Sequence, residues 1–286
     1  PDEKNRQEVY QQLQSQGLNP YQLEASEKGG TRSLQVFPGA ILSLGNEQIA
    51  VNVLQAQIGQ APESQMNASI EKLEYTLANA IRKISSDRRP RIAFIEGHDE
   101  LKPRYLADLG RTLSEHYVVE RFNMREFAVD TASGRPSIAA QLQRLNTFDA
   151  AMIAKPQRGF TDLDLYLIDQ FIMNGGKTLW LLDMVQAEMD SLSNRPEFLA
   201  IPIDERLRLR NSLFRYGVRV NTNLVQDLLA AGLNDSREVR PWVYSPLVMP
   251  YIDHPITKDL NGIRLEFSST LDTLLLKGVR KTILLQ

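Results

Sequence analysis

Between residues 91 and 181 the sequence alternates short apolar runs with amphipathic helical patterns, and this alternation limits the fold more than any other feature. Continuous apolar runs such as AFI, AMIA and LWLL are typical of parallel strands covered on both faces. Right-handed crossovers between such strands predict an α/β fold with a doubly wound, mostly parallel sheet. The predicted strands are 91–95, 117–122, 149–154 and 177–183, and the predicted helices are 103–115, 137–145 and 161–174.

The helix that starts at residue 161 is the best specified of these elements. Thr161 is suited to the N-cap position, and Asp164 stands three residues later, as in a capping box. Gly175 is placed to end the helix. The apolar residues recur at helical spacing and predict one buried face, made of Leu163, Leu167, Ile168, Phe171 and Ile172.

The first 60 residues predict a separate, smaller α/β domain. A polar helix over 2–16 is followed by a β-hairpin, GAILSL and QIAVNV, with Gly45 and Asn46 at its tip. Thioredoxin-like domains end in a similar way, so we expect a partial domain of that type over 1–60. A long helix over 62–84, with apolar residues on one face, then opens a doubly wound domain over 61–286.

The last hundred residues carry weaker patterns. The Arg-rich run 206–217 predicts an amphipathic helix with a solvated basic face, in preference to an anion site. The prolines and aromatic residues of 241–257 predict an irregular segment packed on the domain. Late strands are expected within 263–269 and 282–286.

Composition excludes several kinds of function. The net charge of −2 lacks the basic excess of a nucleic-acid-binding surface. The chain has no cysteine, so it can form no thiolate metal site and has no thiol nucleophile. Its three histidines lie far apart without metal-ligand spacing, so we expect no metal and no cofactor. No apolar run has the length of a membrane span, and a start at Pro1 and an end within a strand-like run suggest a chain trimmed at both ends.

Charged residues follow three of the predicted strands and form the candidate site. They are Glu96, His98, Lys155 and Asp183. Because ligands bind beyond the carboxyl ends of parallel strands, we expect these four residues in one region at that edge of the sheet. They could line a ligand or docking site, or they could pair with one another and cap loops and helices. We favour the second interpretation over catalysis, because the sequence supplies no nucleophile among them.

Motifs for other chemistries are missing around these residues. The turn GHDELKPRY lacks the further glycines of a dinucleotide-binding loop, and no P-loop occurs, so the sequence predicts no nucleotide site. There is also no GxSxG turn for a serine nucleophile. Glu96 and Asp183 could serve as paired carboxylates of a glycosidase, but the sequence gives no distance between them.

Several long segments resemble the gliding-motility-associated auxiliary proteins (GldG) of the ABC-type uncharacterised transport family. They include IAFIEGHDEL, FDAAMIAKPQRGFTDLDLYLIDQFIMNGGKTLWLLDMV, LFRYGVRVNTNLVQDL, PWVYSPLVMP and HPITKDLNGIRLEFSSTLDTL, in the family's order. The resemblance implies a fold similar to class I glutamine amidotransferases without their activity. It also implies anchors in the cytoplasmic membrane, a periplasmic location for this region, and permease and ATPase subunits as partners. The family has no accepted catalytic motif, so the resemblance implies no site residue.

We therefore expect a non-catalytic, extracytoplasmic auxiliary component of an ABC transporter associated with gliding motility, which acts through protein contacts. Two alternatives stay open at this point. One is a solute-binding module of the transporter, and the other is a hydrolase-like or amidotransferase-like enzyme at the carboxyl edge of the sheet. A deep pocket with converging polar groups at that edge would favour ligand binding, whereas a shallow edge would favour a role in protein contacts.

Overall fold

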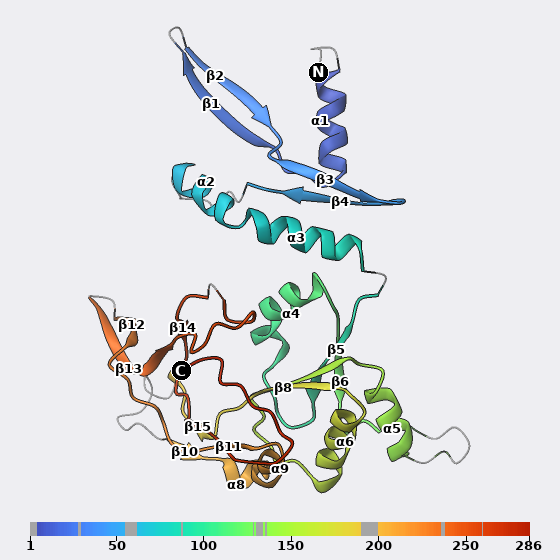
Figure 1. Ribbon diagram of the computed structural model, residues 1–286, viewed down its shortest axis with the longest axis vertical. Helices are drawn as coiled ribbons and strands as arrows, with labels where there is room; N and C mark the ends of the chain where they lie inside the picture. Colours follow the sequence, from blue (N-terminus) through green and yellow to red (C-terminus); the bar gives the residue numbers. More distant parts are fainter. Residues whose placement is uncertain are drawn as a thin grey trace. The chain divides into compact units, whose positions relative to one another are not determined.

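The computed structural model describes residues 5–27, 30–54, 62–86, 88–127, 129, 134, 136–189, 200–235, 238–258 and 260–286. The chain divides into two compact units, Pro1–Arg89 and Pro90–Gln286 (Figure 1). This boundary lies about thirty residues after the one that the sequence suggested at 60/61. The difference arises because the helix assigned to the second domain packs on the hairpin of the first unit.

The first unit consists of helices and two antiparallel hairpins. Its helices are α1 (Arg6–Ser15), α2 (Pro62–Glu71) and α3 (Leu73–Ile84), and its strands are β1 (Tyr21–Glu27), β2 (Gly30–Val36), β3 (Gly39–Leu44) and β4 (Glu47–Asn52). The predicted hairpin of β3 and β4 is confirmed, with Leu44 opposite Glu47 and Gly45 in the left-handed region at φ 57°. The predicted helix 62–84 is interrupted at Lys72, although the Lys72 amide still donates to the carbonyl of Ala68.

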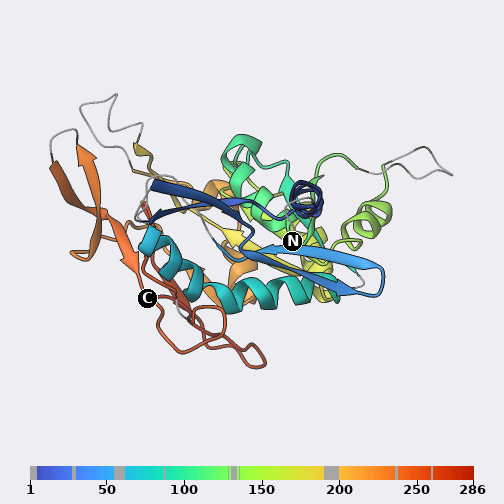
Figure 2. The same ribbon diagram turned by 90° about the horizontal axis from the view of Figure 1, so that it is seen from above.

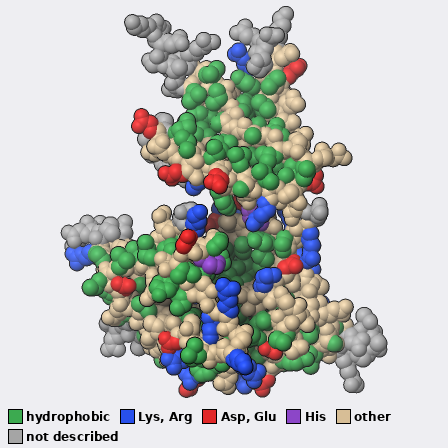
Figure 3. Space-filling model, viewed as in Figure 1, with side chains coloured by type: hydrophobic (Ala, Val, Ile, Leu, Met, Phe, Trp, Pro, Cys, Tyr) green, Lys and Arg blue, Asp and Glu red, His purple; other side chains and the backbone are tan. Residues whose placement is uncertain are grey.

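Burial in the first unit is limited. Leu18, Val51, Ala80 and Ile84 are buried, whereas Met66, Ile70 and Tyr75 are more than half exposed. Hydrophobic side chains accordingly occupy much of the face of this unit that Figure 3 shows. Two small hairpins and an amphipathic helix can enclose only a few residues, because a small unit keeps a high ratio of surface to volume.

The second unit contains the predicted parallel sheet. Its strands are β5 (Arg91–Glu96), β6 (Val118–Asn123), β7 (Ala150–Ala154) and β8 (Lys177–Leu181), in the order β6-β5-β7-β8 and all parallel. The connections contain α4 (Ala107–Ser114, after a 3₁₀ turn at Pro103–Tyr105), α5 (Ile138–Leu145) and α6 (Asp162–Met173). The predicted strand and helix positions between 91 and 181 are thus confirmed to within a few residues.

Helices cover both faces of this sheet. Side chains alternate along β5, so Ala93 and Ile95 lie in one cluster with Leu167 and Phe171 of α6. Ile92 and Phe94 lie in a second cluster with Leu106 and Leu113, at α4. The mixed α/β class and the parallel sheet are therefore confirmed, whereas the amidotransferase-like and thioredoxin-like assignments stay predictions.

Helix α6 forms as its sequence predicts. The Thr161 side chain accepts from the Asp164 amide at 3.2 Å, and the Asp164 carboxylate accepts from the Thr161 amide at 2.8 Å, which completes the capping box. Leu167, Ile168 and Phe171 are buried, and Leu163 and Ile172 pack on the same core partly buried. Gly175 follows the helix in the left-handed region at φ 94°.

The remainder of the second unit is built from short elements. They are β9 (Val185–Gln186), β10 (Ile201–Pro202), α8 (Asp204–Leu207), α9 (Arg210–Arg215), β11 (Val218–Val220), β12 (Ala230–Asp235), β13 (Glu238–Val248), β14 (Ile263–Arg264) and β15 (Leu271–Thr273). Strand β11 pairs with β15, and the long hairpin of β12 and β13 projects from the rest of the unit (Figure 2).

Three sequence predictions for this region were wrong. The segment expected to be irregular contains the longest described strand, β13, which accommodates Pro241 opposite Gly232 and Pro246 beside a register shift in β12. Pro241 is tolerated because β14 pairs only with Leu247 and Val248, so β13 has a single neighbour there. The strand expected over 282–286 is reduced to one bridge between Leu285 and Pro250.

The third error concerns the Arg-rich run 206–217, which is not one helix. It breaks between α8 and α9, where Arg208 adopts a left-handed conformation at φ 61°.

Replacement of Phe171 by Ala should lower the free energy of unfolding by about 3–5 kcal/mol, because it leaves a cavity under the sheet. Phe171 is 1% exposed, and its ring also fills the space beside Gly176. Met173→Ala, on the same helix at 73% exposure, is the matched control and should change stability by about 0.5 kcal/mol or less. Urea denaturation of both variants measures the difference. Equal losses in the two variants would contradict the placement of α6.

Candidate functional site

The four residues selected from the sequence all follow strand ends at one edge of the parallel sheet. Glu96 ends β5, His98 follows it, Lys155 follows β7, and Asp183 lies two residues after β8. Because the three strands are parallel, their carboxyl ends lie at the same edge, which we call the crest. At the crest the four residues take part in three separate interactions and do not form one site.

His98 lies at the centre of a buried polar cluster. Its side chain is fully buried and stacks on Phe160, with the ring centroids 3.8 Å apart. Nδ1 lies 3.1 Å from Oε1 of Glu100. Nε2 lies 3.1 Å from Oδ2 of Asp164, close enough for an ion pair but without the geometry of a hydrogen bond.

The two carboxylates decide the charge of His98. Burial alone would lower the pKa of His98, but Asp164 and Glu100 outweigh burial and raise this pKa above its ordinary value of 6.5. Burial would likewise raise the pKa of Asp164, yet His98 and the donors of Thr161 lower it below 3.8. Both carboxylates thus favour the cationic form of the imidazole, and their contacts with His98 connect the loop after β5 to the first turn of α6.

The other candidate residues form ion pairs that are partly exposed. Glu96 lies 2.6 Å from a guanidinium nitrogen of Arg121 on the neighbouring strand β6. Lys155 lies 3.1 Å from Asp183 and 3.5 Å from Glu188. Lys155 itself has a left-handed backbone conformation, φ 51°, at the turn after β7. These contacts neutralise the charges that the sequence places at the strand ends.

Two open cavities lie on the crest. One, of about 360 Å³, is lined by Glu96, Gly97 and Arg121 among others, and the other, of about 230 Å³, lies between Glu100 and Lys155. The larger of them is lined by more cationic than acidic side chains.

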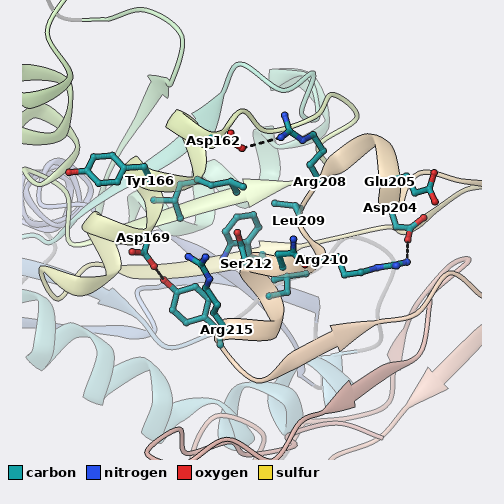
Figure 4. Close-up of a pocket in the computed structure, with 16 residues that line it drawn as sticks. Asp162, Tyr166, Asp169, Asp204, Glu205, Arg208, Leu209, Arg210, Ser212 and Arg215 are labelled. Carbon is teal, nitrogen blue, oxygen red and sulfur yellow. Dashed lines mark hydrogen bonds and ion pairs between the residues drawn. The ribbon is translucent and has the colours of Figure 1, made fainter.

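A further cavity of the second unit lies away from the crest, beside α6, α8 and α9. It measures about 550 Å³, within the range of ligand pockets. Figure 4 shows charged side chains on its rim, with Asp162 joined to Arg208, Asp204 to Arg210, and Asp169 to the Tyr216 hydroxyl. Leucine, isoleucine and tryptophan side chains also line this α6–α9 groove, namely Leu165, Ile168, Trp180, Leu209 and Leu213.

Two charged groups of the α6–α9 groove have neither an ion pair nor a hydrogen bond among the described residues. Arg215 and Glu205 are exposed and line the cavity. By contrast, the Tyr216 hydroxyl donates to Asp169 at 2.6 Å, and burial together with Asp169 raises the pKa of Tyr216 far above 10. Sequence reasoning missed this groove, because it treated the Arg-rich run as one solvated helix. The break at Arg208 is what turns α9 toward α6.

Ser212 lines the α6–α9 groove, but neither His98 nor any other histidine lines it with Ser212. Within the described ranges no group of three or more acidic or histidine side chains could hold a metal ion. In the same part of the chain, no helix is both long and apolar enough to cross a membrane.

The stability of the protein should depend on pH through His98. A histidine whose pKa is raised by folding contributes stability that is complete below its unfolded pKa, about 6.5, and disappears as the pH rises through the higher folded pKa. His98→Gln should therefore cost about 3–5 kcal/mol at pH ~6, with the difference from the wild type shrinking at alkaline pH. Urea denaturation from pH ~6 to ~9 measures the difference.

Glu100→Gln provides the matched variant for this experiment. It removes one of the two carboxylates that raise the pKa of His98, so the loss of stability should begin at lower pH. Parallel pH profiles for the wild type and His98→Gln would contradict this prediction, because they would show that folding leaves the pKa of His98 unchanged.

Comparisons of the sequence and the fold with known proteins identify the family of this chain. No curated protein matches this chain. A solved structure described as "mmIFT52 N-terminal domain" is similar at 14% sequence identity and a TM-score of 0.43, over 66% of this chain and 69% of that chain. The family model described as "ABC-type uncharacterized transport system" matches residues 89–286, which include the whole parallel sheet, the crest and the α6–α9 groove. Since this match covers well over half of the sequence, the chain belongs to the auxiliary proteins of the ABC-type uncharacterised transport system family.

Proposed function

We propose that this protein is a non-catalytic auxiliary component of an ABC transporter, and that it acts through contacts with other proteins of the complex. Family membership supports the link to an ABC-type transport system. The permease and ATPase subunits of the same transporter are then the partners that we expect.

The single observation that carries the non-catalytic part is the pairing of the crest carboxylates. Glu96 pairs with Arg121, and Asp183 pairs with Lys155. The only histidine at the crest is fully buried between Glu100 and Asp164. A general base or nucleophile must reach the substrate, and these groups are directed toward one another instead.

The finer assignment rests on the sequence resemblance. GldG-like segments support a role associated with gliding motility, a periplasmic location, and attachment to the cytoplasmic membrane through anchors outside this sequence. The same resemblance supports an amidotransferase-like second unit, and the order of elements in the first unit supports a thioredoxin-like relationship. In this proposal both folds have a structural role only, since the chain has no cysteine for amidotransferase or thiol chemistry.

The α6–α9 groove is the surface that we assign to protein contact. Its apolar lining residues, such as Leu165 and Leu209, can receive an apolar side chain of the partner. Arg215 and Glu205 have no ion-pair partner in the described part of the chain, so both can pair with charges of the partner at the rim. Aromatic and arginine residues beside a desolvated centre are typical of the residues that dominate binding energy in interfaces.

A second candidate function, a solute-binding module of the transporter, is favoured by the volume of the same groove. About 550 Å³ is enough for a small solute. The two functions differ in what occupies the groove, and they can be separated by experiment.

Co-purification of the full-length protein with its permease and ATPase tests the proposal. Ser212→Trp would fill the groove, and Arg215→Ala would remove its unpaired cation. We expect each change to reduce co-purification, the first to background and the second by about tenfold, because a charged anchor contributes 1.4 kcal/mol or more. Glu96→Gln is the matched crest variant and should leave assembly intact, with a stability loss of about 1 kcal/mol or less for a half-exposed pair.

Thermal melts verify that the variants remain folded. If Ser212→Trp co-purifies normally but transport fails, the groove binds solute and the second candidate is correct. If Glu96→Gln abolishes assembly of folded protein, docking occurs at the crest instead.

A further inference from the structure

The larger cavity on the crest has an excess of positive charge that the pairing of its residues does not remove. We call it the crest cavity. Four of its residues are cationic and three are acidic; they are Lys102, Arg121, Arg125 and Arg158, and Glu96, Asp99 and Glu100. These groups come from the end of β5 and the loop after it, from β6 and the turn after it, and from the loop after β7.

The acidic residues are already engaged. Glu96 pairs with Arg121 at 2.6 Å, and Asp99 pairs with Arg158 at 3.1 Å. Glu100 is directed inward, where it contacts the Nδ1 atom and accepts from the backbone amide of His98. Two cations therefore have no carboxylate partner among the described residues, Lys102 and Arg125.

Arg125 retains most of its donors. Its guanidinium donates to the carbonyl of Gly159 at 3.2 Å, and the side chain is exposed. Its backbone amide donates to Oδ1 of Asn123, which holds the turn after β6 in place. A guanidinium bound to one neutral carbonyl keeps its full charge for a ligand.

Backbone amides add further donors. In the described residues no acceptor is found for the backbone amides of three residues that line the cavity, Gly97, Asp99 and Glu100. Gly97 and Asp99 have positive φ values, 124° and 53°, so the backbone of this loop turns on both sides of His98. A Cβ atom at Gly97 would lie 3.2 Å from Arg125 and from Asn123, so the loop needs glycine to bring its backbone beside Arg125.

From this geometry we propose that the crest cavity binds a phosphate group. Two uncompensated cations match a dianionic phosphate better than a singly charged carboxylate, and three free amides suit its several oxygen atoms. The position beyond the carboxyl ends of β5 and β6 is where ligands bind in open parallel sheets. The proposed site uses neither a P-loop nor a dinucleotide-binding loop, and it is independent of the partner contacts proposed for the α6–α9 groove.

Titration of the full-length protein with inorganic phosphate, followed by isothermal calorimetry at low ionic strength, tests the proposal. Low salt is needed because salt screens exposed charges. We expect saturable binding that is weakened about tenfold or more by Arg125→Ala, and by a similar factor by Lys102→Ala, through loss of a charge-assisted contact. Arg111→Ala, an exposed arginine of α4 outside the cavity, is the matched control and should bind phosphate like the wild type.

The source of the phosphate is distinguished in a second experiment with vesicles. Retention of the protein on vesicles that contain phosphatidic acid, but not on phosphatidylcholine vesicles, with loss in Arg125→Ala, would identify a lipid headgroup. Binding of glycerol phosphate in solution without vesicle retention would identify a soluble phosphate ester. Binding of acetate as tight as phosphate, unchanged phosphate binding in folded Arg125→Ala, or no saturable phosphate binding by the wild type would each overturn the proposal.

Discussion

The second unit depends on the buried contact of His98 with Glu100 and Asp164. It connects two segments that are far apart in the sequence, the loop after β5 and the first turn of α6. The carbonyl of His98 also accepts from the amides of Gln157 and Arg158, so the loop after β7 is attached to the same residue. A buried charge of this kind is tolerated only where opposite charges and hydrogen bonds surround it. Three connections of the crest therefore share one electrostatic centre.

Other charged residues of the crest are also paired. The imidazole of His98 is stacked on Phe160, enclosed by two carboxylates and fully buried. The acids that remain near the strand ends are paired with lysine or arginine. An arrangement common in enzymes, with polar groups beyond the ends of parallel strands, is here used to hold loops together. The charges at the crest without a partner of opposite charge among the described residues include those of Lys102 and Arg125.

The α6–α9 groove results from a close approach between two loops. The amide of Phe160 donates to the carbonyl of Leu207 at 3.1 Å, which attaches the short helix α8 to the loop before α6. A Cβ atom at Gly159 would lie 2.3 Å from the carbonyl oxygen of Arg206, so only glycine permits this approach. The left-handed Arg208 then turns the chain into α9, whose Arg215 and Ser212 face the cavity. The capping box of α6 and the groove beside it are thus parts of the same local structure.

Local sequence determined the parallel sheet, the helix that starts at Thr161 and the hairpin of β3 and β4. These features depend on neighbouring residues, namely the period of the apolar side chains, the spacing of a capping box and a Gly-Asn turn. The strand-end positions of Glu96, His98, Lys155 and Asp183 followed from the same patterns, because parallel strands present their carboxyl ends at one edge.

Tertiary structure decided the rest, because it depends on residues that are distant in the sequence. Asp164 was recognised as a capping residue, but only the fold places its carboxylate against His98. Strand β13 forms despite its prolines because it pairs with β12. The register of this pairing shifts beside Pro246. The α6–α9 groove requires Gly159 to lie against Arg206, and the crest cavity requires Lys102 and Arg125 from different loops. Periodicity and turn chemistry are properties of adjacent residues, whereas the pairing of charges and the shape of a cavity arise only when separate segments meet.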